Sequence, residues 1–220
     1  MVYMMLRFAM APLAMAGVLQ DPTQSLPDSY KRQFENDYVR VVRVHYDAGA
    51  KLTEHTHPGG TTVYVYLNDS EGVVFSHVGG SNRAVTRPPV KAGAIRIAAG
   101  PEEHHTAENT SSAPSDFLRV YFKTDDGGVK NLRQRLSPTE EFNNKQMRIT
   151  RVTIQPGETT LIEAKDFPVL RITASRGMKQ WTKLPEDFVR FLDKGTTEEF
   201  SASGEFPADI IRMDFLTKPR

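Results

Sequence analysis

The stretch 39–44, VRVVRV, recurs 108 residues later as 147–152, MRITRV. A second pair of stretches, 114–119 (PSDFLR) and 207–212 (PADIIR), is related by an offset of 93 residues. Two matches in the same order, framing similar patterns, indicate a duplicated unit. The second copy is 15 residues shorter between its matched ends. We therefore expect two similar domains in tandem.

Both copies consist of short alternating runs rich in Val, Ile, Tyr, Phe and Thr, such as 62–66 (TVYVY) and 117–122 (FLRVYF). Gly, Pro, Asn and Asp separate these runs, and helical periodicity is almost absent after residue 30. Runs of this length and spacing are typical of all-β sandwiches and barrels. The sequence therefore predicts an all-β fold.

The matched stretches place the first domain at 30–124 and the second at 146–217. The segment 125–145 between them starts with DDGG at 125–128 and is polar, which is typical of a linker. Within it, 137–141 (SPTEE) has an early proline followed by acids, as at the start of a helix. We expect either one short helix or a flexible connector there.

The N-terminal segment 1–20 has the features of a signal peptide. Its only charged residue is Arg7, an apolar stretch follows, and 14–16 (AMA) fits a small-x-small cleavage pattern. The apolar stretch is too short to span a bilayer comfortably. We expect cleavage near Ala16 and a periplasmic or secreted protein without a membrane span in the mature chain. An N-terminal helix or a disordered leader is the alternative.

Composition excludes several classes of function. The net charge is +1, no dense Lys/Arg run occurs and Trp181 is the only tryptophan, so nucleic-acid binding has no support. The absence of cysteine excludes disulfides, thiolate metal sites and a cysteine nucleophile.

All six histidines, at positions 45, 55, 57, 77, 104 and 105, lie in the first copy. His55 and His57 are two residues apart, so on a strand both side chains point to the same face and can chelate one divalent metal ion. A third ligand must come from elsewhere in the barrel, and 100–109 (GPEEHHTAEN) is the candidate segment. Glu102 and Glu103 in this segment are expected to be solvated turn residues.

These residues resemble the two motifs of the cupin superfamily. The first motif is a glycine, five residues, His-x-His and a later glycine; here these are Gly49, His55, His57 and Gly72. The second motif has a glycine, a short strand, another glycine, a histidine and an asparagine; here these are Gly93, strand 94–97, Gly100, His105 and Asn109. His104 does not fit the spacing. The resemblance covers about residues 38 to 124, and the repeat extends it weakly to the C-terminus.

The resemblance implies double-stranded β-helix (jelly-roll) barrels in tandem, a bicupin. It also implies one metal site, with His55, His57 and His105 as ligands. The usual fourth ligand, a glutamate, is missing, because Thr61 or Thr62 occupies its place. Imidazole ligands suit one divalent ion of iron, zinc, nickel, copper or manganese, and the identity stays open.

The threonine that faces inward decides which residues line the pocket. If Thr62 faces inward, Tyr64 and Tyr66 do so too, because side chains alternate along a strand. If Thr61 faces inward, the valines between them line the pocket instead. Thr61, Thr62, Tyr64 and Tyr66 are therefore the pocket candidates.

The second copy contains no histidine. The repeat places Glu163, Lys165 and Phe200 opposite the three histidines, so we expect a degenerate barrel without metal. The 15 missing residues are expected mostly at the loop of the His-x-His pair and the strands after it.

Some cupins with three histidine ligands, such as thiol dioxygenases and diketone-cleaving dioxygenases, activate oxygen. The resemblance thus implies a metal-dependent oxygenase or dioxygenase, an oxidoreductase that acts on a small molecule. The alternatives are a cupin that binds a small molecule or sugar without turnover, a metal-dependent isomerase or lyase, and a purely structural bicupin. A catalytic acid or base is not identified, and a homodimer is left open.

Overall fold

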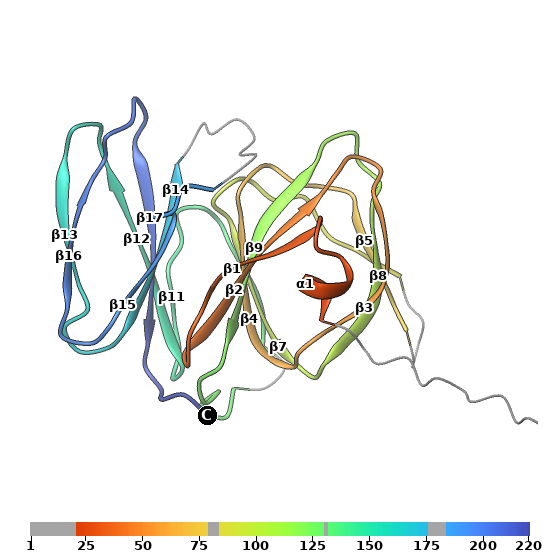
Figure 1. Cartoon of the computed structure of the whole chain (residues 1–220), viewed down its shortest axis with the longest axis horizontal. Coiled ribbons are helices and arrows are strands. Elements are labelled where there is room, and N and C mark those ends of the chain that lie inside the picture. Colours follow the sequence, from red (N-terminus) through yellow and green to blue (C-terminus); the bar gives the residue numbers. More distant parts are fainter. Residues whose placement is uncertain (1–20, 79–83, 130–131, 176–183) are drawn as a thin grey trace, which may run out of the picture.

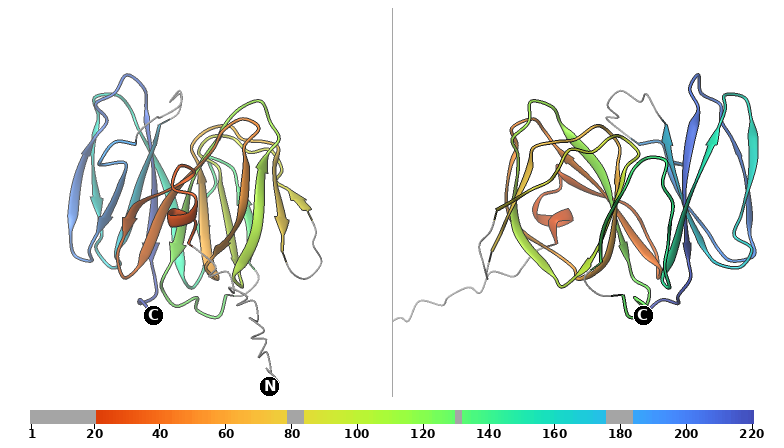
Figure 2. Two further views of the ribbon diagram at one scale, coloured as in Figure 1. Left: turned by 45° about the vertical axis from the view of Figure 1, so that its right-hand side comes forward. Right: turned by 180° about the vertical axis from the view of Figure 1, so that it is seen from behind.

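The computed structural model describes residues 21–78, 84–129, 132–175 and 184–220. They form two antiparallel β-barrels that lie side by side (Figure 1, Figure 2). The predicted all-β tandem fold is thus confirmed. The expected signal peptide, 1–20, and Trp181 lie outside the described residues.

The first barrel consists of a large and a small sheet. The large sheet has the strand order β1 (Tyr30–Glu35), β2 (Val39–Tyr46), β9 (Ser115–Phe122), β4 (Gly60–Tyr66), β7 (Ile95–Gly100) and β10 (Arg133–Leu136). The small sheet has the order β3 (Lys51–His57), β8 (Glu103–Asn109), β5 (Val73–His77) and β6 (Ala84–Thr86). This is the strand order of a jelly roll, in which neighbours within a sheet come from distant parts of the chain.

The second barrel repeats this arrangement with fewer strands. Its large sheet has the order β11 (Phe142–Asn143), β12 (Met147–Ile154), β17 (Ala208–Phe215), β14 (Val169–Ser175) and β15 (Val189–Leu192). Its small sheet pairs β13 (Thr159–Glu163) with β16 (Thr197–Ser201). Within the described residues, no strands correspond to β5 and β6.

The two large sheets pack face to face and share one apolar core. Val41 and Val120 of the first barrel belong to it together with Ile149 and Met213 of the second, and all four are fully buried. One further apolar cluster fills the inside of each barrel. The central strands of the large sheets are therefore buried on both faces, as expected for a sheet covered on both sides.

The backbone register confirms the sequence repeat. Val41 pairs with Val120 on the neighbouring strand, and Ile149 pairs with Met213 at the matching place in the second barrel. These pairs preserve the offsets of 108 and 93 residues. The packing of the two large sheets thus brings equivalent faces of the two copies together.

In its described residues, the segment 125–145 forms neither the short helix nor the flexible connector that the sequence suggested. β10 adds to the edge of the first barrel's large sheet, and β11 adds to the edge of the second. The stretch that resembles a helix start, 137–141, is non-helical; Ser137 N–H donates to the Glu140 carboxylate within a turn. Edge pairing supplies backbone hydrogen bonds that a free connector would leave to water.

A single turn of helix, α1 (Pro22–Ser25), lies at one end of the first barrel beside β1 and β3 (Figure 1). Asp21 caps it by accepting a 2.9 Å hydrogen bond from the backbone N–H of Thr23. Leu26 then packs against the core of the barrel. Across the described residues, no helix has the length and apolar character that crossing a membrane requires.

Candidate metal centre

Three histidines meet inside the first barrel. His55 and His57 lie on β3, and His105 lies directly opposite His55 on β8. The three residues are at most 2% exposed, and one ring nitrogen from each lies within 4.8 Å of the others. The structure thus brings together the complete set of predicted ligands. They come from two strands, and 47 residues of sequence lie between His57 and His105.

Neighbouring groups hold two of the three rings in place. Nδ1 of His55 lies 2.8 Å from the carbonyl oxygen of Thr53, so this nitrogen carries the proton. Nδ1 of His57 lies 2.9 Å from the hydroxyl of Tyr121. In both rings, Nε2 is left as the nitrogen that can face a metal ion, and such hydrogen bonds on the far nitrogen are typical of histidine ligands.

Three of the six ring nitrogens in the group lack a hydrogen-bond partner, whereas Nε2 of His55 bonds to the hydroxyl of Tyr30. Nε2 of His57 and both ring nitrogens of His105 are buried without a hydrogen bond. Unsatisfied buried polar atoms are rare in folded proteins and call for an explanation such as an ion. Three imidazoles at this separation fit one divalent metal ion.

The surroundings keep the histidines neutral, which is the form that binds metal. Burial lowers the pKa of His55. Burial and then the nearby guanidinium of Arg119 hold the pKa of His57 well below its usual value. The same two causes lower the pKa of His105 to about 2.

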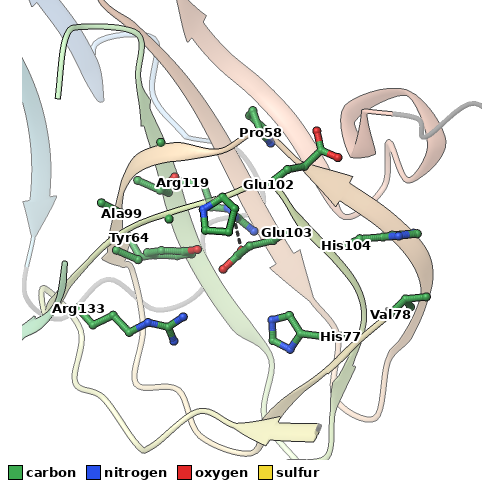
Figure 3. Close-up of a pocket in the computed structure, with 15 residues that line it drawn as sticks. Pro58, Tyr64, His77, Val78, Ala99, Glu102, Glu103, His104, Arg119 and Arg133 are labelled. Carbon is green, nitrogen blue, oxygen red and sulfur yellow. Dashed lines mark hydrogen bonds and ion pairs between the residues drawn. The ribbon is translucent and has the colours of Figure 1, made fainter. Parts of the chain in front are cut away.

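A cavity of about 250 Å³ lies next to the histidine group; its lining includes Pro58 and Glu103, neighbours of the three histidines in sequence, but not the three histidines themselves. Thr62 and Tyr64 line it together with His77, whose ring lies 5.6 Å from that of His105 (Figure 3). Tyr66 lines two adjacent cavities rather than this one. The even-numbered positions of β4 therefore face inward, which resolves the choice between the two threonines.

Thr61 is excluded from the pocket. Its side chain lies on the opposite face of β4, toward the second barrel, where the hydroxyl donates a 2.7 Å hydrogen bond to Oε1 of Gln146. Thr62 is thus the inward residue at the place of the absent glutamate. The sequence pattern could not show which of the two threonines faces inward, because Thr61 and Thr62 are both buried.

Glu103 was expected to be a solvated turn residue, and this expectation is wrong. It lies on β8 two residues before His105, so its carboxylate points into the same cavity (Figure 3). There it accepts a 3.2 Å hydrogen bond from Arg119, itself almost fully buried. Burial opposes ionisation, but Arg119 and His105 lower the pKa of Glu103 to about 2. The sequence did contain a signal for this position, because Glu103 is two residues from His105 and residues two apart on a strand share a face.

The register of the second barrel corrects the predicted counterparts of the histidines. The backbone bond from Asn109 N–H to the Ala50 carbonyl has its equivalent in the bond from Ala202 N–H to Glu158. From there the register places Ile162 opposite Glu198, where the first barrel has His55 opposite His105. Ala164 takes the position that matches His57.

The counterparts are therefore Ile162, Ala164 and Glu198 rather than Glu163, Lys165 and Phe200. For His55 and His57 the reason is a β-bulge between Leu52 and His55, which adds one residue to β3 and shifts the offset from 108 to 107. For His105, the pairing of β16 gives an offset of 93 rather than the 95 that Phe200 required. All three histidines are still replaced, so in the described second barrel the three equivalent positions hold no imidazole.

The shorter length of the second copy agrees with one part of the expectation, which placed the missing residues in the strands after the His-x-His pair, and not with the other, which placed them in the loop of that pair. The offset is still 107 where Tyr64 corresponds to Arg171, and falls to 94 where Arg96 corresponds to Arg190. Most of the missing residues thus lie between the strands equivalent to β4 and β7, where the first barrel has β5 and β6. The expected shortening of the His-x-His loop is wrong.

Comparison with solved structures supports this architecture. The bacterial pirin YhhW from Escherichia coli in complex with nickel(II) is similar with a TM-score of 0.54 and 13% identity over 83% of both chains. Quercetin 2,3-dioxygenase from Acinetobacter baumannii is similar with a TM-score of 0.52 and 9% identity, over 83% of this chain and 76% of that one. A protein from Pseudomonas aeruginosa, described as glyoxylate-induced, has a TM-score of 0.55 and 11% identity, over 83% and 77%.

At these identities the likeness establishes the fold alone. A scan of the sequence against family models and a search of curated proteins found no match. The chain has a bicupin fold of the kind seen in pirin and quercetin dioxygenase. Its first barrel contains a buried group of three histidines that can hold one metal ion.

Proposed function

We propose that this protein is a metal-dependent oxygenase that acts on a small molecule in its first barrel. The observation that carries the proposal is the buried group of His55, His57 and His105, in which one ring nitrogen from each residue lies within 4.8 Å of the others. Three neutral ligands leave positions of a metal ion open to oxygen and substrate, which favours oxygen activation over a closed structural site.

A bound metal ion would supply Lewis acidity and, as iron or copper, redox chemistry. The chain's own residues position this chemistry. Thr53 and Tyr121 orient the rings of His55 and His57 through their hydrogen bonds. The apolar ring of Phe75, 4.8 Å from that of His105, and the buried tyrosines around the group limit the access of water.

Glu103 places an ionised carboxylate in the described cavity, where it can accept a hydrogen bond from a bound molecule. Its ion pair with Arg119 fixes its position, and the ring of Tyr64 lies against the same guanidinium at 4.9 Å. The cavity is also bordered by Thr62, whose hydroxyl can donate a hydrogen bond. A small molecule bound there would lie beside His105 and His77.

The solved structures add support through their printed descriptions. One similar protein was solved with nickel(II), and another is a quercetin 2,3-dioxygenase. They make metal binding and dioxygen chemistry the first activities to assay in this chain.

The test is metal analysis combined with an oxygen assay. The protein is purified, its metals are measured, and oxygen consumption is recorded after loading with Fe(II) in the presence of a panel of small phenols, diketones and thiols. We expect consumption with at least one substrate class, lost in His57→Ala and kept in His45→Ala, whose imidazole lies outside the group. Zinc or nickel as the native metal, with turnover but no oxygen uptake, would replace the oxygenase by an isomerase or lyase.

A further inference from the structure

A row of cationic side chains crosses the inner face of the first barrel's large sheet. Arg135 on β10 pairs directly with Arg96 on β7, Arg96 pairs with Tyr64 on β4, and Tyr64 pairs with Arg119 on β9. The guanidiniums of Arg96 and Arg119 lie 4.8 and 4.9 Å from the centre of the Tyr64 ring. Like charges directly opposite each other on neighbouring strands destabilise a sheet. The pair Arg135 and Arg96 therefore needs a compensating partner.

The second barrel has the same row with its charges neutralised. The register places Arg190, Arg171 and Arg212 at the positions of Arg96, Tyr64 and Arg119. Glu198 lies 2.8 Å from Arg171 and 3.4 Å from Arg190, and Asp214 lies 2.7 Å from Arg212. Each arginine of this row thus has a carboxylate from the chain itself.

In the first barrel, other residues take the positions of these two carboxylates. By the same register, His105 replaces Glu198 and Tyr121 replaces Asp214. The first barrel thus has a histidine of the buried group at the position where the second barrel has a counter-ion of its arginine row. Among the described residues, Glu103 forms an ion pair with Arg119 and attracts Arg87 and Arg96 only at longer range, and no carboxylate lies within ion-pair distance of Arg96 or Arg135.

A second cavity, of about 270 Å³, lies where these arginines meet two more. Arg87, Arg96, Arg133 and Arg135 line it, and no described residue of its lining is acidic. Every Asp and Glu of the sequence lies within the described residues, so no part of the chain outside them can supply a carboxylate. Arg96 is only 7% exposed, and Nε of Arg87 is buried without a hydrogen bond.

Electrostatic repulsion is visible at Arg87. Burial and then the neighbouring charge of Arg96 lower the pKa of the Arg87 guanidinium to about 10. Guanidiniums crowd in this way where an oxyanion, bound through several charge-assisted hydrogen bonds, compensates them.

We propose that this four-arginine cavity binds the oxyanion group, carboxylate or phosphate, of a small molecule, and that this molecule is the substrate of the adjacent histidine site. Only the assignment of this molecule as the substrate rests on the proposed function; the binding of an oxyanion does not. Arg133 lines both this cavity and the one beside the histidines, where its side chain points inward (Figure 3). Arg87 lies 4.7 Å over the ring of Phe75, which contacts His105. One molecule can therefore reach from the arginines toward the metal group.

The test measures anion binding in metal-free protein. Calorimetric titrations in chelator at low salt use succinate, benzoate and inorganic phosphate, with the neutral amides succinamide and benzamide as matched controls. Arg133→Gln and Arg135→Gln remove one charge each at exposed positions, so folding is retained. Arg190→Gln removes the charge at the position equivalent to Arg96 in the second barrel.

We expect at least one anion to bind and its neutral analogue not to bind. Arg133→Gln and Arg135→Gln should weaken binding about tenfold, and Arg190→Gln should leave it unchanged. Arg135→Gln should also raise the melting temperature of the ligand-free protein, because it relieves the repulsion with Arg96; a merely structural arginine would lower it.

Two results would overturn the proposal: an amide that binds as well as its carboxylate, or variants that bind all three anions like wild type. The relative affinities of carboxylates and phosphate assign the oxyanion. Because chelator is present throughout, anion binding can succeed while the oxygen assay fails, in which case only the proposed oxygenase activity is wrong.

Discussion

The hydroxyl of Tyr30 lies 2.8 Å from Nε2 of His55, the ring nitrogen that faces the other two histidines. Because Nδ1 of His55 donates to the Thr53 carbonyl, Nε2 accepts this hydrogen bond. Tyr30 is also hydrogen-bonded to Tyr46 at 2.6 Å and is almost fully buried. The hydroxyl of Tyr30 thus lies on the lone pair that a metal ion would use at His55.

Replacement of Tyr30 by Phe should therefore tighten metal binding. The competing hydrogen bond contributes about 1 kcal/mol, which corresponds to about fivefold in affinity. Competition with a chromophoric chelator measures the change, and Tyr38→Phe, at the packing of the two barrels, is the control. Weaker binding in Tyr30→Phe would show that the hydroxyl assists the metal instead.

The wild-type protein should bind about one divalent ion per chain through its imidazole nitrogens. His57→Ala and His105→Ala should each lose most of this metal, since two histidines make an incomplete ligand set. His45, which is partly exposed and paired with Asp47, should tolerate Ala without loss. Elemental analysis of the purified variants measures this, and unchanged metal content in His57→Ala and His105→Ala would refute the site.

Phe200 and His105 should differ in their contributions to stability. Phe200 is buried in the core of the second barrel, with the Arg171 guanidinium 4.9 Å over its ring. Truncation to Ala should reduce the free energy of unfolding by about 3–5 kcal/mol. His105→Ala should reduce it much less, because its ring nitrogens form no hydrogen bonds in the metal-free protein. Thermal melts in chelator compare the two; a collapse of His105→Ala alongside a wild-type melt of Phe200→Ala would contradict this.

The hydrogen bond between Thr61 and Gln146 should stabilise the contact between the barrels. Thr61→Val keeps the shape of the side chain but leaves the buried Gln146 oxygen without its donor. We expect a loss of about 1–3 kcal/mol in the free energy of unfolding. Thr159→Val, at an exposed hydroxyl pair, should change it little. Equal effects in urea titrations of the two variants would argue against a special role for Thr61.

Export remains a prediction from the sequence. We propose that the chain is cleaved after Ala16 or a few residues later and that the mature protein is periplasmic or secreted. Mass spectrometry of the protein from its native host, after cell fractionation, measures the N-terminus. Recovery of a chain that still starts at Met1 in the cytoplasm would rule this out.

The sequence alone was enough to predict the tandem all-β fold and to name the three histidines that the structure brings together. Alternation along a strand is local, so His55 and His57 had to share a face wherever that strand lay. The repeat between 39–44 and 147–152 likewise required two copies of one pattern. The spacing of the second motif then selected His105 over His104, which in the structure faces outward and pairs with Glu54.

Only the tertiary structure decided which face of β4 is inside the barrel. Val63 is buried between the barrels and Tyr64 within the first barrel. Because both faces of β4 are buried, its sequence shows no alternation of apolar and polar residues that would mark the inner face. The bulge before His55 was equally invisible, because one added residue changes a register only when the partner strand is in place. The arginine row shows the same limit: Arg135, Arg96 and Arg119 are far apart along the chain, and only sheet pairing brings their charges together. Cross-strand neighbours depend on the topology of the whole sheet, whereas the sequence specifies directly only what lies within a strand.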